Sequence, residues 1–206
     1  EPLPEEALLQ DLAWADAVVA GPGLSKSRTA KELLVFTVQH TEVPLVLDAD
    51  ALNLIAEDAE ILSGCRAEKI LTPHVGELAR LLHMMTIAEC QRDPAGSAGR
   101  AAEKYQACCV RKDSVTVTAE EGREQYYINT SGSSALATAG SGDVLAGITG
   151  AFAAKRQCEK NEKKISLAKT AALAAYAHGK AGEAAEEKSS ASYVTASEII
   201  RGLQSI

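Results

Sequence analysis

Three short apolar runs, each followed by a segment with helical periodicity, constrain the fold of this chain more than any other feature. We expect strands within residues 15–23, 43–50 and 69–74. We expect the helices that follow them to span residues 27–40, 51–62 and 75–82. Such alternation is typical of a mainly parallel sheet covered by helices on both faces. The sequence therefore predicts an α/β fold with its ligand edge at the carboxyl ends of the strands.

The second half of the chain has a different pattern. Residues 93–106 predict a loop and a helix, and residues 107–130 predict strands around the polar turn AEEGRE. We expect these strands to pair in antiparallel fashion. Two further helices are predicted over residues 143–157 and, in an alanine-rich segment, 167–185.

Charge and cysteine content exclude several classes of partner. The 206 residues, 46% of them hydrophobic, can bury a full core, and the net charge of -7 argues against nucleic acid or an anionic membrane as the main partner. Five cysteines without a CxxC pair suggest neither a disulfide framework nor a zinc site. With no apolar run near 20 residues and no signal-like start, the cytoplasm is the expected compartment.

The segment AGSGD, residues 139–143, sets glycines directly before an aspartate and an apolar helix. The backbone N–H groups of Gly140, Ser141 and Gly142 suit a phosphoryl group, because the first turn of a helix has amides without partners. Asp143 would then take a proton from an attacking hydroxyl. The alternative, which we weigh equally, is a glycine-rich turn with Asp143 as a helix N-cap or first-turn acid.

The segment LTPHVGE places His74 and Glu77 at the start of a helix, just after a buried strand. Pro73 fixes the backbone where the strand ends, so that His74 is directed toward the ligand edge. In the alternative interpretation Glu77 is only a first-turn acid, and His74 is a loop residue with satisfied hydrogen bonds.

Two further segments place polar groups and glycines at strand ends. In LDADALN we expect Asp48 and Asp50 to alternate along a strand, so that only one faces a given pocket. Asp50 would then cap the next helix, whereas a buried Asp48 would require a specific partner. In AGPGL the expectation is a tight turn, in which Gly23 also lets a flat ligand lie against bare backbone.

Taken together, four segments identify a family. GPGL, LDADALN, LTPHVGE and NTSGSSALATAGSGDVLAG occur in this order and resemble the NAD(P)H-hydrate dehydratases of the ribokinase-like superfamily, along nearly the whole chain. GSGD alone is shared with many ribokinase-like kinases, but its combination with the other segments is specific. The resemblance implies a ribokinase-like fold and a metabolite-repair enzyme that restores NADH or NADPH from their hydrates, driven by ADP in bacterial members and ATP in eukaryotic ones.

The resemblance also assigns roles to residues. Asp143 would contact the hydrated nicotinamide and act as base, the loop from Gly140 through Ser141 to Gly142 would be the phosphate anion hole, and His74 and Gly23 would line the hydrate's pocket. Asp50, Asn53 and Glu77 are placed in the surroundings of the site. The adenosine part of the nucleotide would bind the stretch Lys112, Asp113, Ser114, Val115 and Thr116. Taken alone, Lys112 would be an ordinary lysine at a strand end.

The chemistry implied is a lyase reaction coupled to nucleotide hydrolysis. Hydroxide is a poor leaving group, and phosphorylation of the ring hydroxyl would convert it into a good one. Asp143 would help that hydroxyl attack the terminal phosphoryl group, while the loop amides stabilise the charge and Mg²⁺ bridges the phosphates. No residue is assigned as a metal ligand.

The chain departs from the family pattern in three places. Ser25 and Ala139 stand where glycine is common. We read residues 1–206 as a single ribokinase-like domain without the strand-helix region that usually precedes it in the family. A sheet without that region would expose an edge, so we expect a homo-oligomer or a segment supplied from elsewhere to cover it.

Two other functions remain open. A ribokinase-like kinase for a vitamin precursor or sugar would keep Asp143 and the anion hole but release a phosphorylated product. A nucleotide-binding remnant without catalysis is the other alternative.

Overall fold

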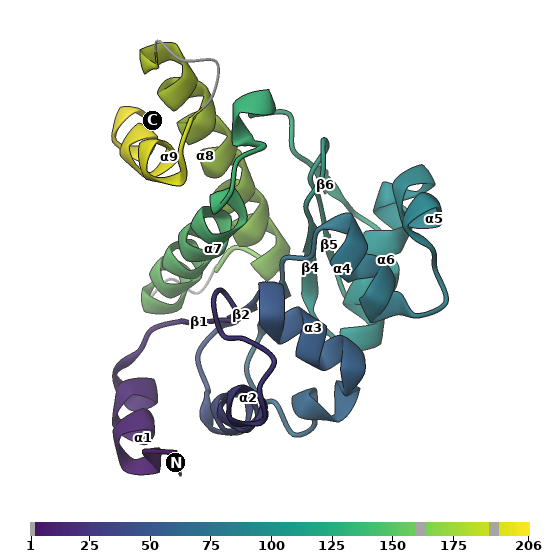
Figure 1. The fold of residues 1–206 in the computed structure, drawn as a ribbon, viewed down its shortest axis with the longest axis vertical. Coiled ribbons are helices and arrows are strands. Elements are labelled where there is room, and N and C mark those ends of the chain that lie inside the picture. The colour runs from purple at the N-terminus through teal and green to yellow at the C-terminus, as the bar shows by residue number, and fades with distance from the viewer. Residues whose placement is uncertain (1–2, 160–163, 190–193) are drawn as a thin grey trace.

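The computed structural model describes residues 3–159, 164–189 and 194–206 and has the predicted α/β architecture. A six-stranded sheet runs through the molecule in the order β1-β2-β3-β4-β5-β6 (Figure 1). The strands are β1 (Val18–Ala20), β2 (Leu45–Leu47), β3 (Lys69–Leu71), β4 (Cys108–Arg111), β5 (Val117–Glu120) and β6 (Tyr127–Ile128). Strands β1 to β4 are parallel, and β5 pairs in antiparallel fashion with both β4 and β6, so the sheet is mainly parallel with the predicted antiparallel pairing in residues 107–130.

Helices cover both faces of this sheet, which confirms the predicted layers. The α-helices are α1 (Glu5–Trp14), α2 (Arg28–His40), α3 (Ala49–Glu57), α4 (Val75–Leu82), α5 (Ile87–Arg92), α6 (Pro94–Tyr105), α7 (Ser141–Cys158), α8 (Leu167–Lys188) and α9 (Ala196–Gly202). In Figure 1, α7 and α8 lie on one side of the strands, and α3, α4 and α6 lie on the other.

Alternate residues of the buried strands supply the two cores. Leu45, Leu47 and Leu71 pack with apolar residues of α2 and α3. Their neighbours Val46 and Ile70 point the other way and pack against α7 and α8. Because both faces of β2 are covered, all three of its residues are buried, as expected of a continuous apolar run in a parallel sheet.

Three α-helices of the described residues, α1, α5 and α9, were not among the predicted elements. All residues of α1 are at least partly exposed, so that this helix lacks the buried face from which helices are recognised. The short helices α5 and α9 each begin with a capping box, formed by Thr86 with Glu89 and by Thr195 with Glu198. The pattern Thr-x-x-Glu in the sequence was the signal for both starts.

None of the helices within the described ranges is long and apolar enough to cross a membrane.

Candidate active site

The carboxyl ends of β1 to β4 meet the start of α7 at one edge of the sheet. Strand β3 continues as Thr72, Pro73 and His74, and Lys112 continues β4 beside them. The backbone N–H of Lys112 donates to the carbonyl of Pro73 at 2.8 Å, and Lys112 forms a parallel bridge with His74. This extra pairing fixes the direction in which the Lys112 side chain leaves the sheet.

The Lys112 ammonium forms an ion pair with the buried carboxylate of Asp48. Nζ of Lys112 donates to Oδ1 of Asp48 at 2.6 Å, and the Asp48 side chain is only 1% exposed. The expectation that a buried Asp48 needs a specific partner is therefore confirmed, and the partner is Lys112.

The expected alternation of Asp48 and Asp50 along a strand is wrong. Strand β2 ends at Leu47 and α3 begins at Ala49, because Asp48 already occupies the N-cap position. Asp50 lies in the first turn of α3 and does not cap it. Its Oδ2 accepts a 2.9 Å hydrogen bond from the backbone of Ser25, which ties the loop after β1 to α3.

The glycine loop before α7 lies against the same lysine. A Cβ built on Gly142 would be 3.3 Å from Nζ of Lys112, so the ammonium reaches the bare backbone of the loop. The structure thus brings together the segments AGSGD and KDSVT through Lys112 and Gly142, which are 30 positions apart in the sequence. An ammonium beside the first amides of an 18-residue helix is a site suited to an anion.

The carboxylate of Asp143 is exposed at this helix start. The N-cap of α7 is Gly140, with a φ of +82°, so Asp143 is not the cap and lies in the first turn. Within the part of the chain that the structure describes, the Asp143 carboxylate accepts no hydrogen bond and pairs with no cation. The N-cap alternative is therefore excluded, while a first-turn acid and a general base remain compatible with this position.

Ser141 and His178 form a buried contact that sequence reasoning missed. Oγ of Ser141 lies 3.2 Å from Nε2 of His178 on α8, and both residues are buried. Burial lowers the pKa of His178 to about 4, and the charge of Lys112 acts in the same direction. The ring is therefore neutral near pH 7. A single histidine within the alanine-rich segment 167–185 was the available signal.

His74 and Glu77 form the capping box of α4. Nδ1 of His74 accepts from the backbone N–H groups of Gly76 at 2.9 Å and Glu77 at 3.4 Å, and Glu77 Oε2 accepts from the backbone of His74 at 2.8 Å. In the neutral ring Nε2 then carries the proton. Glu77 is nearly buried, and this burial raises the pKa of its carboxyl. The His74 ring is half-exposed at the edge, so it both caps the helix and faces solvent.

The loop after β1 carries glycines with two different functions in the backbone. Gly21, with a φ of +125°, approaches Asp48 so closely that a Cβ would lie 1.7 Å from the Asp48 carbonyl oxygen. Gly23 has a φ of +68°, and among the described residues no atom lies near its missing Cβ. Gly21 therefore seats the loop on Asp48, and Gly23 leaves open space above the backbone.

The rest of KDSVT is held by a buried arginine. Arg111, 2% exposed, donates from Nη2 to Asp113 at 2.9 Å and from Nη1 to the carbonyl of Val115 at 3.1 Å. The carbonyl of Thr116 accepts from the backbone of Asn129 at 2.9 Å. Ser114 donates its backbone N–H to Asp113 at 2.8 Å. The stretch is thus a fixed, solvent-facing loop next to Lys112.

Asn53 lies farther out, on α3. Its Oδ1 accepts a 3.0 Å hydrogen bond from Nε of Arg80 on α4. Within the described ranges, no group of three or more His, Cys, Asp or Glu residues is placed to hold a metal ion.

Comparison with known proteins identifies the relatives of this chain. A family model described as NAD(P)H-hydrate dehydratase matches residues 1–205. A bifunctional NAD(P)H-hydrate repair enzyme of Moorella thermoacetica is 41% identical over 181 residues, which cover 87% of this chain and 32% of that enzyme. The chain thus spans about a third of the length of that curated relative.

Two solved structures share the fold. A ribokinase-like superfamily protein from Enterococcus faecalis superposes with a TM-score of 0.78 at 26% identity, covering 97% of this chain and 65% of that one. The ADP/ATP-dependent NAD(P)H-hydrate dehydratase of Bacillus subtilis, co-crystallised with ATP and Mg²⁺, has a TM-score of 0.74 at 28% identity, covering 96% and 68% of the two chains. The predicted ribokinase-like fold is confirmed.

Proposed function

Because this chain belongs to the NAD(P)H-hydrate dehydratase family, we propose that it removes water from hydrated NADH and NADPH in a reaction driven by ADP or ATP. One observation carries the proposal. The Lys112 ammonium lies against Gly142, at a helix start whose exposed carboxylate, Asp143, has no partner among the described residues. An anion site and a free base side by side are what phosphoryl transfer to a hydroxyl requires.

In this proposal the nucleotide lies across the two segments that meet at Lys112. The amides of Gly140, Ser141 and Gly142 and the Lys112 ammonium face the terminal phosphates, because both provide positive charge to the same space. The adenosine part lies along residues 113–116, which Arg111 holds in place through the Asp113 carboxylate and the Val115 carbonyl. Support for the nucleotide comes from the B. subtilis neighbour, whose name gives ADP and ATP.

The oxygen of the ring hydroxyl attacks the terminal phosphorus of the nucleotide, and Asp143 accepts the proton of that hydroxyl. The P–O bond to the shortened nucleotide breaks, and the hydroxyl becomes a phosphate ester. The ring nitrogen's electron pair then expels phosphate, and loss of a proton from the adjacent carbon restores the double bond. The loop amides and Lys112 stabilise the charge on the transferred group.

Mg²⁺ fits this arrangement as an ion that the nucleotide brings with it. Magnesium in such sites is held by substrate phosphates and water with only one or two carboxylates, so a cage of protein ligands is not required. When bound, it would neutralise phosphate charge, and Asp143, which directly follows Gly142 in the first turn of α7, is an exposed carboxylate at this loop.

The hydrated ring lies between His74 and Gly23. The Nε2–H of His74 can donate to a ring substituent, and the open backbone at Gly23 accepts a flat ligand without a clash. Asp50, Asn53 and Glu77 support this pocket through their contacts with Ser25, Arg80 and His74.

One assay separates the dehydratase from the two other functions. Purified protein is mixed with hydrated NADH, Mg²⁺ and ADP or ATP, and the absorbance of the reduced nicotinamide is followed together with phosphate release. A dehydratase gives one NADH for each phosphate. A kinase for a vitamin precursor or sugar and a binding remnant both recover no NADH from this mixture, and that outcome would refute the proposal. Adding candidate vitamin precursors or sugars then separates these two, because only the kinase gives a phosphorylated product.

We also propose a cytoplasmic location and a homo-oligomer. All five cysteines are free thiols, and Cys108 and Cys109 are fully buried, which suits a reducing compartment. Strand β1 is an outer strand of the sheet, and Val19 on it is 39% exposed. Outer strands are usually covered, and sedimentation of the purified chain at several concentrations tests whether a second copy does this.

A further inference from the structure

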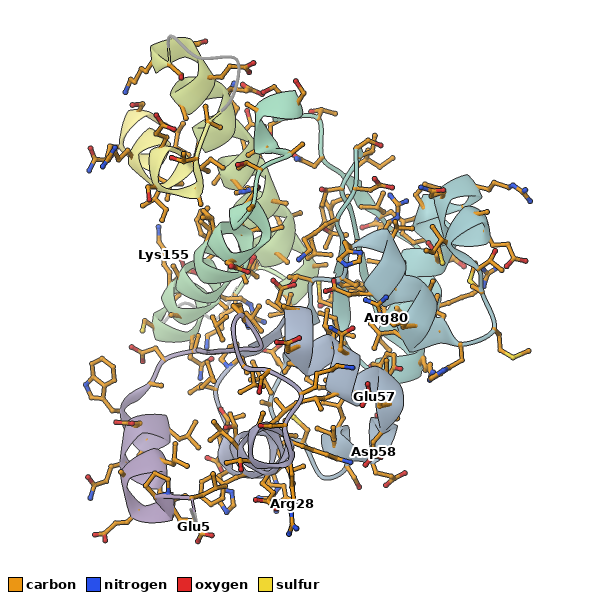
Figure 2. The ribbon with its side chains drawn as sticks, in the orientation of Figure 1. Glu5, Arg28, Glu57, Asp58, Arg80 and Lys155 are labelled. Atoms are coloured by element: carbon orange, nitrogen blue, oxygen red, sulfur yellow. The ribbon has the colours of Figure 1, made fainter. Side chains whose placement is uncertain are left out.

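A groove of roughly 860 Å³ opens between α3 and α4, next to the proposed hydrate pocket. Its walls come from the end of the loop after β1, from α3, and from α4 with the turn that follows it. The polar side chains that line it are those of Lys26, Asn53, Glu57, Arg80, His83 and Thr86. Figure 2 labels Arg80 on α4 and Glu57 on α3, the two facing helices.

The floor of this groove joins it to His74. A Cβ built on Gly76 would lie 2.8 Å from Cε1 of the His74 ring and 3.8 Å from Nη1 of Arg80. The imidazole and the guanidinium therefore flank the same stretch of bare backbone. If the ring of a ligand lies at His74, the part of the ligand attached to that ring lies in the groove.

Arg80 supplies the unbalanced positive charge of the groove. Lys26 is already paired with Glu57 at 2.8 Å. Arg80 has no carboxylate partner within the described residues, and its Nε donates to the neutral Asn53 at 3.0 Å. This bond holds the guanidinium across the groove and leaves four of its five N–H donors free. A last-turn arginine also favours the helix dipole, but that role requires no contact with Asn53.

We propose that Arg80, held by Asn53, binds the pyrophosphate of the dinucleotide substrate in this groove. The inference rests on the proposed function, which places the hydrated ring at His74. In a nicotinamide dinucleotide, the pyrophosphate follows the ring after a single ribose, which matches the closeness of Arg80 to His74. A guanidinium with free paired N–H groups is suited to phosphate oxygens.

The test compares substrates with and without phosphate. We expect Arg80→Ala to lower kcat/KM for hydrated NADH about tenfold to a hundredfold, the range for a lost hydrogen bond to a charged group. For the hydrate of reduced nicotinamide riboside, which lacks phosphate, the same variant should change kcat/KM by less than about twofold. Asn53→Ala should give a smaller loss of the same kind. Arg123→Ala, which removes an exposed arginine paired with Glu120 away from the groove, is the matched control and should change kcat/KM for neither substrate.

Three outcomes would overturn the assignment. If Arg80→Ala slows both substrates equally, Arg80 acts on the reacting ring or on the fold. If it slows neither, the groove does not hold the pyrophosphate. A loss confined to hydrated NADPH would place the 2′-phosphate at Arg80 instead, since the pyrophosphate is common to both dinucleotides.

A binding measurement makes the inference independent of turnover. Calorimetry with NADH and with reduced nicotinamide riboside should show that Arg80→Ala weakens the binding of NADH alone, by about tenfold to a hundredfold. If the wild-type chain binds NADH in this manner but recovers none from its hydrate, the proposed function fails and the pyrophosphate site stands. If NADH binds equally to wild type and variant, the site fails whatever the activity.

Discussion

The ammonium of Lys112 lies 2.6 Å from the carboxylate of Asp48, a residue 64 positions earlier in the chain. The two charges join the end of β4 to the start of α3, directly below the glycine loop of α7. Asp48 is almost fully buried, whereas the Lys112 side chain is 18% exposed. Water can therefore solvate the lysine if the aspartate is removed, but it cannot reach the aspartate in the same way if the lysine is removed.

Removing the lysine should cost more stability than neutralising the aspartate. Lys112→Met leaves a buried carboxylate without a partner, and we expect the free energy of unfolding to fall by about 3 kcal/mol. Asp48→Asn should cost less, because the lysine can turn toward water. The double variant should be more stable than Lys112→Met alone. Urea unfolding of the three variants checks this, and equal single costs that simply add would contradict it.

Asp143→Asn should separate a base from a first-turn acid. Loss of a general base slows turnover by about 10² to 10⁴ fold, while loss of a helix-dipole contact costs only about 0.3–1 kcal/mol. We expect Asp143→Asn to slow turnover by this factor, with nearly unchanged melting temperature and nucleotide affinity. Glu6→Gln, a first-turn acid of α1, is the control and should keep full activity. An Asp143→Asn protein with more than about a tenth of normal turnover would refute the role as base.

Two glycines of α7 offer a matched pair for testing the anion site. A Cβ on Gly142 meets Nζ of Lys112 at 3.3 Å, whereas a Cβ on Gly147 meets no described atom within 4 Å. Gly147→Ala should therefore stabilise the helix by about 0.5–1 kcal/mol and leave nucleotide affinity unchanged. Gly142→Ala should weaken ADP and ATP binding, measured by calorimetry, with little change in folding because the lysine tip can shift. Unchanged affinity in Gly142→Ala and in Lys112→Ala would mean that the nucleotide binds elsewhere.

His178 should make stability depend on pH in the mildly acidic range. Its pKa is about 4 in the folded protein and about 6.5 when unfolded, so between these values only the unfolded chain binds the proton. Stability due to the neutral ring is therefore full above about pH 6.5 and is lost as the pH falls toward 4, by about 3 kcal/mol in total. Unfolding free energies of wild type and His178→Asn across this window check the slope. The exposed His40 serves as control through His40→Gln, and an equal slope in all three proteins would contradict the prediction.

The layers of the fold could be predicted because periodicity alone defines them. Each of the strands β1, β2 and β3 was an apolar run with a helix behind it, and the AEEGRE turn indicated the antiparallel pair. Helix α1 could not be found in this way, since all of its residues are at least partly exposed. The region expected before the domain stays a prediction.

The candidate site was only partly visible in the sequence. Sequence motifs indicated Asp143, Gly142 and His74 as site residues. No local pattern indicates that Lys112 pairs with Asp48 or that His178 contacts Ser141. Those contacts arise between segments far apart in the chain, and packing of the sheet creates them. The strand alternation assumed for Asp48 and Asp50 failed because α3 begins one residue after Asp48, which changes the period.

The strands lie in the sheet in the order in which they occur in the chain, so each can be added beside its predecessor during synthesis on the ribosome. When β4 is added to the sheet, Lys112 can meet Asp48 before α7 and α8 have been synthesised. The carboxylate of Asp143 follows later with α7, which packs back across β1 and β2. The charge pair can therefore form before this carboxylate is in place, and α8, which brings His178 against Ser141, is added later still.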